Sequence, residues 1–133
     1  MMPALVPELT VTDIEASLRF YRDVLGFTVR YERPEEGFAY IFMGTADLML
    51  DQLGTGRDWI TGPLSAPFGR GINIQIEVRR IETIRRRLEE ANVALFQPME
   101  TRFYKTGLGE VIQRQLCVQD PDGYLLRFFE RLA

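Results

Sequence analysis

An alternation of apolar and polar residues predicts a strand near the start of each half of the chain. In Ile72–Val78, isoleucine or valine occupies every second position, while Asn73, Gln75 and Glu77 occupy the positions between them. Successive side chains of a strand point to opposite faces, so the apolar row lies on one face and the polar row on the other. Leu5–Val11 shows a shorter alternation of the same kind. We therefore expect two strands, one in each half.

A helix is predicted directly after the first strand. Apolar residues recur at helical spacing along Ile14–Leu25, and Gly26 then ends the helix as a residue that tolerates the left-handed conformation. Thr12 and Glu15 have the spacing of a capping box, in which a hydroxyl and a carboxylate three residues later satisfy free N–H groups. We expect the helix to begin at this box.

The second predicted helix has the same position relative to its strand. Ile81–Ala91 carries apolar residues at helical spacing, and Asn92 is suited to cap its end. The Arg85–Arg87 run within it is interleaved with glutamates, which favours a solvated helix face over a nucleic-acid patch.

Each half continues with three further strands, which gives the order strand, helix, strand, strand, strand twice. The expected strands are Phe27–Tyr31, Phe38–Met43 and Asp47–Leu53 in the first half, and Ala94–Gln97, Val111–Val118 and Tyr124–Phe129 in the second. Turn residues separate them, and the four residues from Asp120 to Gly123 form the turn before the last strand.

The two halves also repeat individual residues at one fixed offset. Val11, Ile14 and Glu15 recur as Val78, Ile81 and Glu82, each 67 residues later. Such a repeat indicates a tandem of one supersecondary unit and a groove shared by the two. We expect one domain over residues 1–133, with a first module at about 4–53, a connecting loop rich in glycine and proline at 54–71, and a second module at about 72–131.

Composition excludes several functional classes. The 133 residues carry a net charge of −3, which disfavours nucleic-acid binding and mildly favours a cationic ligand. Cys117 is the single cysteine, so no internal disulfide is possible, and we expect it to be a small residue of the core or of a groove wall. No apolar run reaches the length of a membrane span, and the start of the chain shows no leader. We expect a cytoplasmic protein with no membrane partner.

Two motifs at opposite ends resemble a known family. The segment from Val11 to Phe27 is similar to the first helix and the following "LGF" of the vicinal oxygen chelate superfamily, and Asp120–Tyr124 resembles its final "DPDG" hairpin. This superfamily includes glyoxalase I, extradiol dioxygenases, fosfomycin-resistance enzymes and bleomycin-resistance proteins. The resemblance implies an α+β fold in which tandem βαβββ modules form a curved mixed sheet, or cup, with helices packed outside. The polar row of the second half would then face the cup.

The resemblance also identifies the positions of a metal site. Enzymes of this superfamily hold a divalent metal with one His or Glu from each of four strands, and these places are carried over to Val6, Asp51, Asn73 and Arg127. Only Asp51 is a plausible ligand, and an arginine puts a fixed positive charge where a cation would sit. The chain has no histidine. We expect no metal and no cofactor, with either an Asp51–Arg127 ion pair across the cup or both side chains meeting water.

Within the superfamily, the branch without metal ligands is that of the bleomycin-resistance proteins. Val6–Leu9, Phe38–Ala39 and Gln113–Leu116 resemble segments of this branch. The resemblance implies a homodimer that binds a flat, cationic drug without turnover in grooves at the subunit interface, with an N-terminal segment exchanged between subunits. Ile112 stands where the branch has its second stacking aromatic. The expected ligand-binding residues are Phe38, Asp51, Trp59, Phe68, Asn73, Gln75, Glu77, Phe103, Tyr104, Ile112 and Arg127.

Several readings stay open at this point. Phe38 has an alternative role as a core residue, Trp59 and Phe68 as anchors of the connecting loop, and Phe103–Tyr104 as loop packing. A second functional hypothesis is an enzyme of the same superfamily, such as an isomerase or lyase acting on a small carbonyl compound through a carboxylate acid/base pair. A third is a binding module whose ligand is not an antibiotic.

Overall fold

The protein is described by a computed structural model that covers residues 2–56 and 58–133. Met1 and Arg57, which fall in the N-terminal stretch and in the connecting loop, lie outside the described residues. The chain divides into two compact units, the first ending at Phe68 and the second beginning at Gly69. Most of the predicted connecting loop therefore belongs to the first unit. Among the described residues, no helix is long and apolar enough to cross a membrane.

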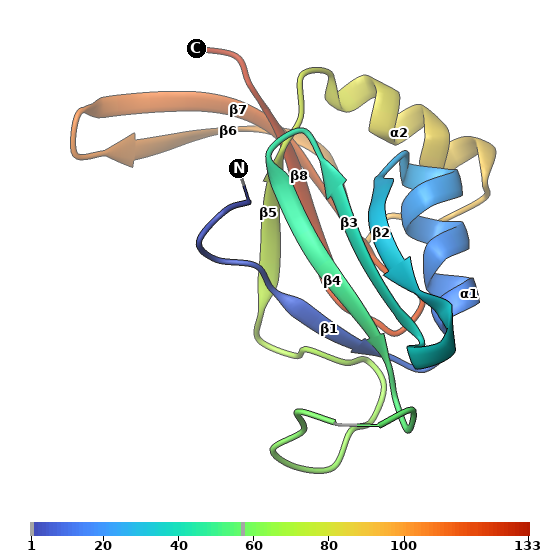
Figure 1. Cartoon of the computed structure of the whole chain (residues 1–133). Helices are drawn as coiled ribbons and strands as arrows, with labels where there is room; N and C mark the ends of the chain where they lie inside the picture. Colours follow the sequence, from blue (N-terminus) through green and yellow to red (C-terminus); the bar gives the residue numbers. More distant parts are fainter. Residues whose placement is uncertain (1, 57) are drawn as a thin grey trace. The chain divides into compact units, whose positions relative to one another are not determined.

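The two units have the same order of elements, as Figure 1 shows. The first contains β1 (Glu8–Val11), α1 (Ile14–Leu18), the π-helix η1 (Arg19–Leu25), β2 (Thr28–Arg33), the 3₁₀ turn η2 (Pro34–Glu36), β3 (Phe38–Met43) and β4 (Ala46–Gln52). The second contains β5 (Asn73–Glu77), α2 (Ile81–Glu90), β6 (Gln97–Thr106), β7 (Gly109–Gln119) and β8 (Leu125–Arg131). The predicted α+β class with tandem βαβββ modules is confirmed.

The strands form two mixed sheets of four, one in each unit. Their orders are β1-β4-β3-β2 and β5-β8-β7-β6, so corresponding strands occupy corresponding places. In each sheet the first and last strands of the unit pair in parallel, and the other pairs are antiparallel. A parallel pair needs a crossover connection, and the helix of each unit supplies part of it.

One face of each sheet packs on the helix of its own unit. In the first unit α1 contacts β4, and the interior contains Val11, Ile41 and Leu50, none of which is exposed. In the second unit α2 contacts β7 and β8, and Leu116 and Phe128 are fully buried. Burying such side chains stabilises each unit, by about 1.5–3 kcal/mol for each fully buried large apolar residue. The helix of the unit does not cover the opposite face of each sheet, and we look for a binding site there.

The first helix begins one residue later than predicted. Asp13, not Thr12, is the N-cap, and its side chain accepts from the backbone N–H groups of Glu15 and Ala16. A further contact was not foreseen, because the N–H of Ile14 donates to Oε1 of Gln52 at the end of β4, over 2.9 Å. Aspartate is as good an N-cap as serine and better than threonine, so the carboxylate prevails over the neighbouring hydroxyl.

The second unit repeats this contact with different residues. The N–H of Ile81 donates to Oε1 of Glu130 in β8 over 3.0 Å, and the N-cap Arg80 provides no side-chain cap. At the other end of α2, Asn92 has a φ of 57°, and the N–H groups of Asn92 and Val93 donate to carbonyls within the last turns of the helix. This is a Schellman ending, which confirms Asn92 as the residue that ends the helix.

The strand expected at Ala94–Gln97 is wrong. Only Gln97 is in a strand, and β6 runs on to Thr106, paired with β7 along its length except at an irregularity near Gln97. Phe103 and Tyr104 thus lie in a strand and not in a loop. The resulting hairpin extends as a long arm in Figure 1. The sequence pattern did not predict the full length of β6 because this strand is mostly exposed and carries polar residues on both faces. The alternation that predicts a strand is therefore missing.

Exposure and ion pairing decide three further expectations. Ile72, expected in the apolar row of the second half, precedes β5 and is 66% exposed, so only the later members of that row contribute to the interior. Cys117 is buried, as expected, and burial raises the pKa of its thiol. The Arg85–Arg87 run behaves as a solvated face, because Arg85 and Arg86 form ion pairs with glutamates of the same helix.

Candidate functional site

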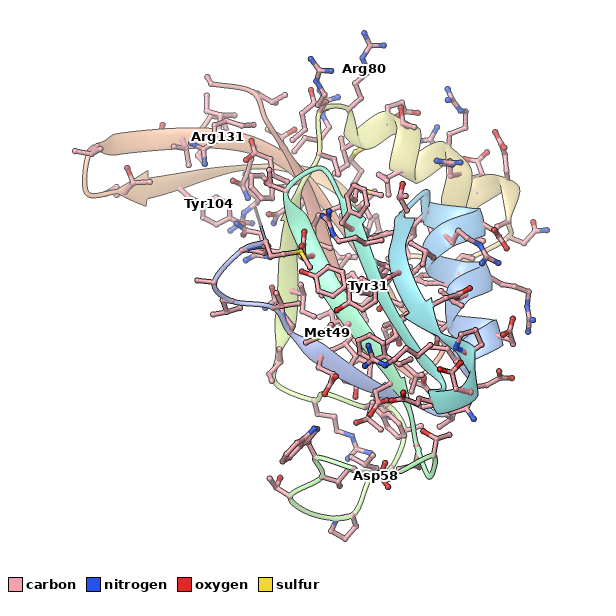
Figure 2. The ribbon with its side chains drawn as sticks, viewed as in Figure 1. Tyr31, Met49, Asp58, Arg80, Tyr104 and Arg131 are labelled. Atoms are coloured by element: carbon pink, nitrogen blue, oxygen red, sulfur yellow. The ribbon has the colours of Figure 1, made fainter. Side chains whose placement is uncertain are left out.

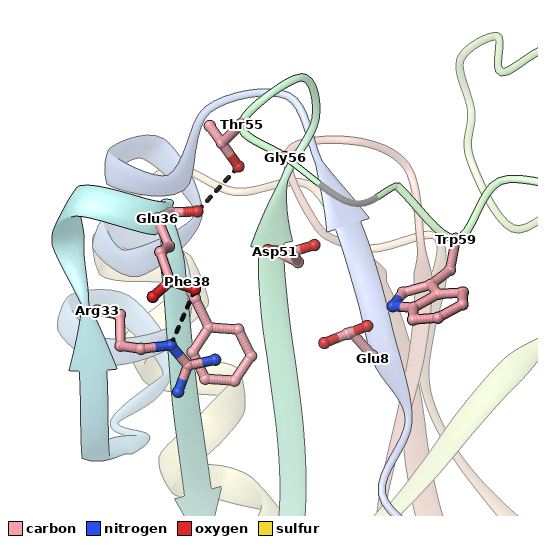
Figure 3. Close-up of a pocket in the computed structure, with 8 residues that line it drawn as sticks. All are labelled: Glu8, Arg33, Glu36, Phe38, Asp51, Thr55, Gly56 and Trp59. Atoms are coloured by element: carbon pink, nitrogen blue, oxygen red, sulfur yellow. Dashed lines mark hydrogen bonds and ion pairs between the residues drawn. The ribbon is translucent and has the colours of Figure 1, made fainter.

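The first unit has a pocket of about 310 Å³ on the face of its sheet that α1 does not cover. We call it the acidic pocket, and Figure 3 shows its lining. It is lined by Glu8, Arg33, Glu36, Phe38, Asp51, Thr55, Gly56 and Trp59. These residues come from β1, the end of β2, η2, β3, β4 and the loop that follows β4. The side chains of Phe38, Asp51 and Trp59, all expected at the site, meet here.

Strand register explains why these side chains share a face. Arg33 pairs with Phe38, which pairs with Asp51, so the three form one row across the sheet. Glu8 belongs to the neighbouring row, because it pairs with Met49. Paired residues on adjacent strands point to the same face. The row therefore places a cation, an aromatic ring and a carboxylate side by side.

A tight turn brings the loop after β4 to the rim of the pocket. Gly37 follows η2 with a φ of 63°, and a Cβ at this position would lie 2.8 Å from Cβ of Gln52. The Thr55 hydroxyl lies 2.8 Å from the carbonyl oxygens of both Glu36 and Gln52, and it donates to these carbonyls. Only glycine combines that backbone conformation with that close approach.

Negative charge dominates the acidic pocket. Burial raises the pKa of the Glu8 carboxyl, the charge of Asp51 raises it further, and Arg33 acts in the opposite direction. Burial also raises the pKa of Asp51, and the charge of Asp58 adds to the effect. Both carboxylates are thus short of compensating charge. The one arginine of the lining is already engaged, because Arg33 Nε lies 3.2 Å from Glu36 Oε1.

The two aromatic residues of the pocket differ in accessibility. Phe38 is only 5% exposed, and the Arg33 guanidinium carbon lies 4.0 Å from the centre of its ring. Figure 3 shows this guanidinium beside the ring. Trp59 is 68% exposed, and its indole lies on the other side of Glu8. Trp59 is therefore the more exposed of the two aromatic residues, and Phe38 the more buried.

Aromatic residues continue beyond the pocket along the same face of the sheet. Tyr31 stacks on Tyr40 with ring centres 5.2 Å apart, in the row that contains Met49 and Glu8. Figure 2 labels Tyr31 and Met49 on this face. The Tyr40 hydroxyl and Asp47 Oδ2 lie 2.5 Å apart, and burial together with this bond raises the pKa of Tyr40 to about 12. Tyr40 is thus a fixed, neutral donor at neutral pH.

The remaining sequence-predicted residues of the first unit and the missed ones can now be placed. Phe68 is buried at the end of the unit and does not line the acidic pocket. The pocket also contains Glu8, Arg33 and Glu36, which are not among the ligand-binding residues expected from the sequence. The charged residues around the Pro34 turn were the one available signal, and nothing in them indicated the direction of the side chains.

The second unit has its own pocket, of about 340 Å³, which we call the arginine pocket. It is lined by Gln75, Tyr104, Val111, Gln113, Arg127 and Arg131. Three of the expected site residues, Gln75, Tyr104 and Arg127, meet here. Asn73 lies beside them, because Arg127 Nε donates to Asn73 Oδ1 over 3.0 Å.

Three other expected residues of the second unit do not line this pocket. Glu77 is exposed on the same face of β5, two residues beyond Gln75. Phe103 and Ile112 pair with each other, next to the pair of Tyr104 and Val111. Because side chains alternate along a strand, Phe103 and Ile112 point to the face opposite to the arginine pocket.

Register corrects the assignment of equivalent positions. Glu8 pairs with Met49 just as Gln75, its equivalent 67 residues later, pairs with Arg127. Met49 is therefore the counterpart of Arg127. Aligning Gly44 with Asp120, which places Asp51 at the position of Arg127, is therefore wrong by two residues. The Asp51–Arg127 ion pair would involve residues of different units, and it stays a prediction.

The corrected positions are a poor fit to a metal. Carried over by register, the four places are Val6, Met49, Asn73 and Arg127, a set with an aliphatic, a thioether, an amide and a guanidinium side chain. Divalent metals in proteins prefer imidazole, thiolate or carboxylate ligands. Within residues 2–56 and 58–133, no three Cys, Asp or Glu side chains gather as a metal site would require.

Comparison with known proteins identifies the family. Residues 4–128 match the family model of the Glyoxalase/Bleomycin resistance protein/Dioxygenase superfamily. A member of that superfamily from Vibrio splendidus 12B01 is 37% identical, over 94% of this chain and 95% of its own, with a TM-score of 0.43. A search of curated proteins found no match.

Two solved structures of low identity share the fold. A virulence protein from Salmonella typhimurium, STM3117, has a TM-score of 0.69 and 20% identity, over 99% of this chain and 98% of its own. TioX from Micromonospora sp. ML1 has a TM-score of 0.71 and 21% identity, over 98% of this chain and 99% of its own. Together with the family match, the repeated βαβββ units show that the chain belongs to the glyoxalase/bleomycin-resistance/dioxygenase (vicinal oxygen chelate) superfamily.

Proposed function

We propose that the protein binds a flat, cationic small molecule of the bleomycin type in the acidic pocket, without turnover. The observation that carries this proposal is the composition of the pocket, in which three carboxylates face one arginine and an exposed indole. A cation entering beside Glu8 and Asp51 supplies the compensating charge that both carboxylates lack. Sequestration of this kind would confer resistance to such a drug.

The aromatic part of the ligand is expected to use Trp59 first. An indole that is 68% exposed provides a stacking face, and aromatic pairs contribute about 0.5–1.5 kcal/mol beyond the area that they bury. Stacking on Phe38, the residue expected from the resemblance, requires the Arg33 guanidinium to leave its place over the ring. A planar ligand that displaces Arg33 would take the place of the guanidinium over the Phe38 ring.

We further propose that binding needs no metal. The side chains at the four carried-over positions give no ligand set, and the arginine among them opposes a cation. The pocket also lies around Glu8 and Asp51 and not around those positions. Titration after exhaustive chelation tests this directly, because a metal-dependent site would lose its affinity.

We propose a homodimer as the working form, with the ligand grooves at the subunit interface. Large exposed apolar side chains support this proposal, since such surface usually marks an interaction site. Tyr31, Ile72 and Phe103 are 43%, 66% and 60% exposed, and Leu108 at the tip of the β6–β7 hairpin is fully exposed. Light scattering at micromolar concentration is expected to give twice the chain mass, and a monomer mass would contradict the proposal.

One observation favours a second candidate, a metal-free isomerase or lyase acting on a small carbonyl compound. Glu8 and Asp51 line one pocket and both have raised pKa values, and a pair of carboxyl groups of this kind can act as a general acid and a general base. An NMR assay of proton exchange in small α-hydroxy ketones and aldehydes distinguishes this candidate. Catalysed exchange that Glu8→Gln abolishes would favour the enzyme, and its absence would favour the binding protein.

The test of the proposed function is calorimetric titration of chelator-treated protein with metal-free and with copper-loaded bleomycin. We expect one drug per groove with micromolar or tighter affinity, a marked loss in Asp51→Asn, and little change in Glu32→Gln. Glu32 is the matched control because it pairs with Ala39 of the core and so points away from the pocket. Absence of heat at several temperatures would contradict the antibiotic reading, and a screen of flat cations would then test the non-antibiotic binding module.

A further inference from the structure

The arginine pocket of the second unit carries a charge opposite to that of the acidic pocket. Two of its six lining residues are arginines, and no carboxylate lines it. Register places Arg127 and Arg131 on the same face of β8, where they flank the row of Phe129 and Gln115. Figure 2 labels Tyr104 and Arg131 where the β6–β7 hairpin joins the rest of its sheet.

Neither guanidinium is neutralised within the described part of the chain. Arg127 uses Nε to donate to the Asn73 side chain, a neutral acceptor, and its two terminal nitrogens form no hydrogen bond or ion pair within the described residues. Arg131 forms no ion pair or side-chain hydrogen bond with any residue in 2–56 or 58–133. This contrasts with Arg85 and Arg86 of α2, both of which pair with glutamates. The pocket therefore holds unpaired positive charge.

A chain of hydrogen bonds orients the neutral polar groups of the pocket so that hydrogens of Tyr104 and Gln113 remain available to a ligand. Glu100 Oε2 accepts from Gln115 Nε2 over 2.8 Å, which fixes the orientation of this amide. The same nitrogen donates to the Tyr104 hydroxyl oxygen over 2.8 Å, so the hydroxyl proton of Tyr104 points elsewhere. Gln115 Oε1 accepts from Gln113 Nε2 over 3.1 Å, and this nitrogen keeps a second hydrogen.

The acidic residues near the pocket do not cancel its charge. Glu100 does not line the pocket and accepts hydrogen bonds from Gln115 and Gln97, while Glu130 points to the other face, where it caps α2. Glu77 is exposed at the end of β5 and does not line the pocket. Arg102, paired with Gln113 in the sheet, adds a further positive charge on this face. The surroundings are thus positive and rich in hydrogen-bond donors.

We propose that the second unit binds the oxyanion group of a small molecule, a carboxylate or a phosphate, between Arg127 and Arg131. Guanidinium groups match both groups because their N–H bonds form a planar fork that contacts two oxygens at once. The Tyr104 hydroxyl and the amides of Gln75 and Gln113 supply further donors, and an anion accepts from all of them. This inference concerns a different site from the proposed cation pocket and does not depend on it.

The experiment is an NMR titration of the full chain, at constant ionic strength, with inorganic phosphate in one series and benzoate in another. We expect saturable shifts of the pocket resonances below about 20 mM with at least one of these probes, as for a modest affinity near the millimolar range. A response to phosphate alone identifies a phosphoryl ligand, and a response to benzoate alone identifies a carboxylate ligand. Tetramethylammonium, a cation of similar size, is expected to cause no saturable shift there.

Variants decide whether the arginines bind the anion. Arg127→Gln and Arg131→Gln are each expected to weaken binding by at least about fivefold, the loss of a charge-assisted hydrogen bond. Tyr104→Phe, which removes one donor and keeps the ring, is expected to weaken it less. Arg87→Gln is the matched control, because it removes the same charge from an exposed position on α2. Linear shifts with both probes, or equal affinity in all variants, would overturn the proposal.

Discussion

Replacing Glu8 by glutamine is expected to weaken cation binding and to stabilise the folded protein at neutral pH. The side chain keeps its shape and loses its charge. A carboxylate and a cation about 4 Å apart attract by roughly 1 kcal/mol in water and about 4 kcal/mol at the dielectric typical of a protein surface. Because Glu8 is exposed at the mouth of the acidic pocket, the lower part of this range applies. We therefore expect a loss of about 1–1.5 kcal/mol, or roughly tenfold in Kd.

The effect on stability has the opposite sign. The folded state raises the pKa of Glu8, so over the window between its ordinary and its raised pKa the folded protein keeps a proton that the unfolded chain has released. The resulting stability is present below that window and is lost as the pH rises through the raised pKa. At neutral pH the wild type holds an uncompensated charge, and Glu8→Gln removes it. The difference between the two proteins is expected to vanish in acid.

Both effects are measured on the same two samples. Calorimetry with metal-free bleomycin gives the affinity, and urea unfolding at neutral and at acid pH gives the free energy of unfolding. The control Glu32→Gln carries the same charge change on a residue outside the pocket and is expected to alter neither quantity appreciably. If Glu8→Gln binds as tightly as the control, or is less stable than the wild type at neutral pH, the electrostatic reasoning is refuted.

Three further predictions concern the framework of the first unit, and all are checked by urea or thermal unfolding. Asp13→Ala is expected to cost about 1 kcal/mol through loss of the N-cap, and an unchanged free energy of unfolding would contradict the assignment of the cap. Ser17→Ala is expected to stabilise the protein by about 1 kcal/mol, because the Ser17 hydroxyl is fully buried with no hydrogen-bond partner among the described residues, and a loss of stability would count against this. Gly37→Ala is expected to cost more than 1 kcal/mol, roughly the cost of a left-handed non-glycine residue, because its Cβ also meets Gln52; an unchanged midpoint would show that the turn relaxes.

Much of the fold was predictable because local signals and the repeat agreed. The alternation in Ile72–Val78, the glycine after Leu25 and the DPDG turn each indicated an element at its observed place, apart from small shifts at the ends. The β6 strand was not predictable from pattern. Its stability comes from pairing with β7 along a hairpin whose faces are both largely solvated, so the sequence carries no alternation.

The candidate site was predictable only in part. The resemblance indicated Phe38 and Asp51, and the structure brings both to one pocket with Trp59. Arg33 and Glu36 were missed because the direction of a side chain after a turn depends on the register of the strands that follow. The same cause explains the error at Arg127, whose counterpart by register is Met49 and not Asp51, two residues further along β4. The residues that share a face of the sheet are determined by how the strands pair, and this pairing joins residues that are far apart in the sequence.

The central claim is that a flat cation binds in the acidic pocket, and Trp59 offers the most direct measurement of it. Trp59 is the single tryptophan of the chain and lines that pocket, so its fluorescence reports on the site alone. Titrating chelator-treated protein with metal-free bleomycin is expected to change this fluorescence saturably, with the midpoint found by calorimetry and with a weaker midpoint in Asp51→Asn. Saturable heat without any change at Trp59, or an unaltered midpoint in Asp51→Asn, would contradict the account.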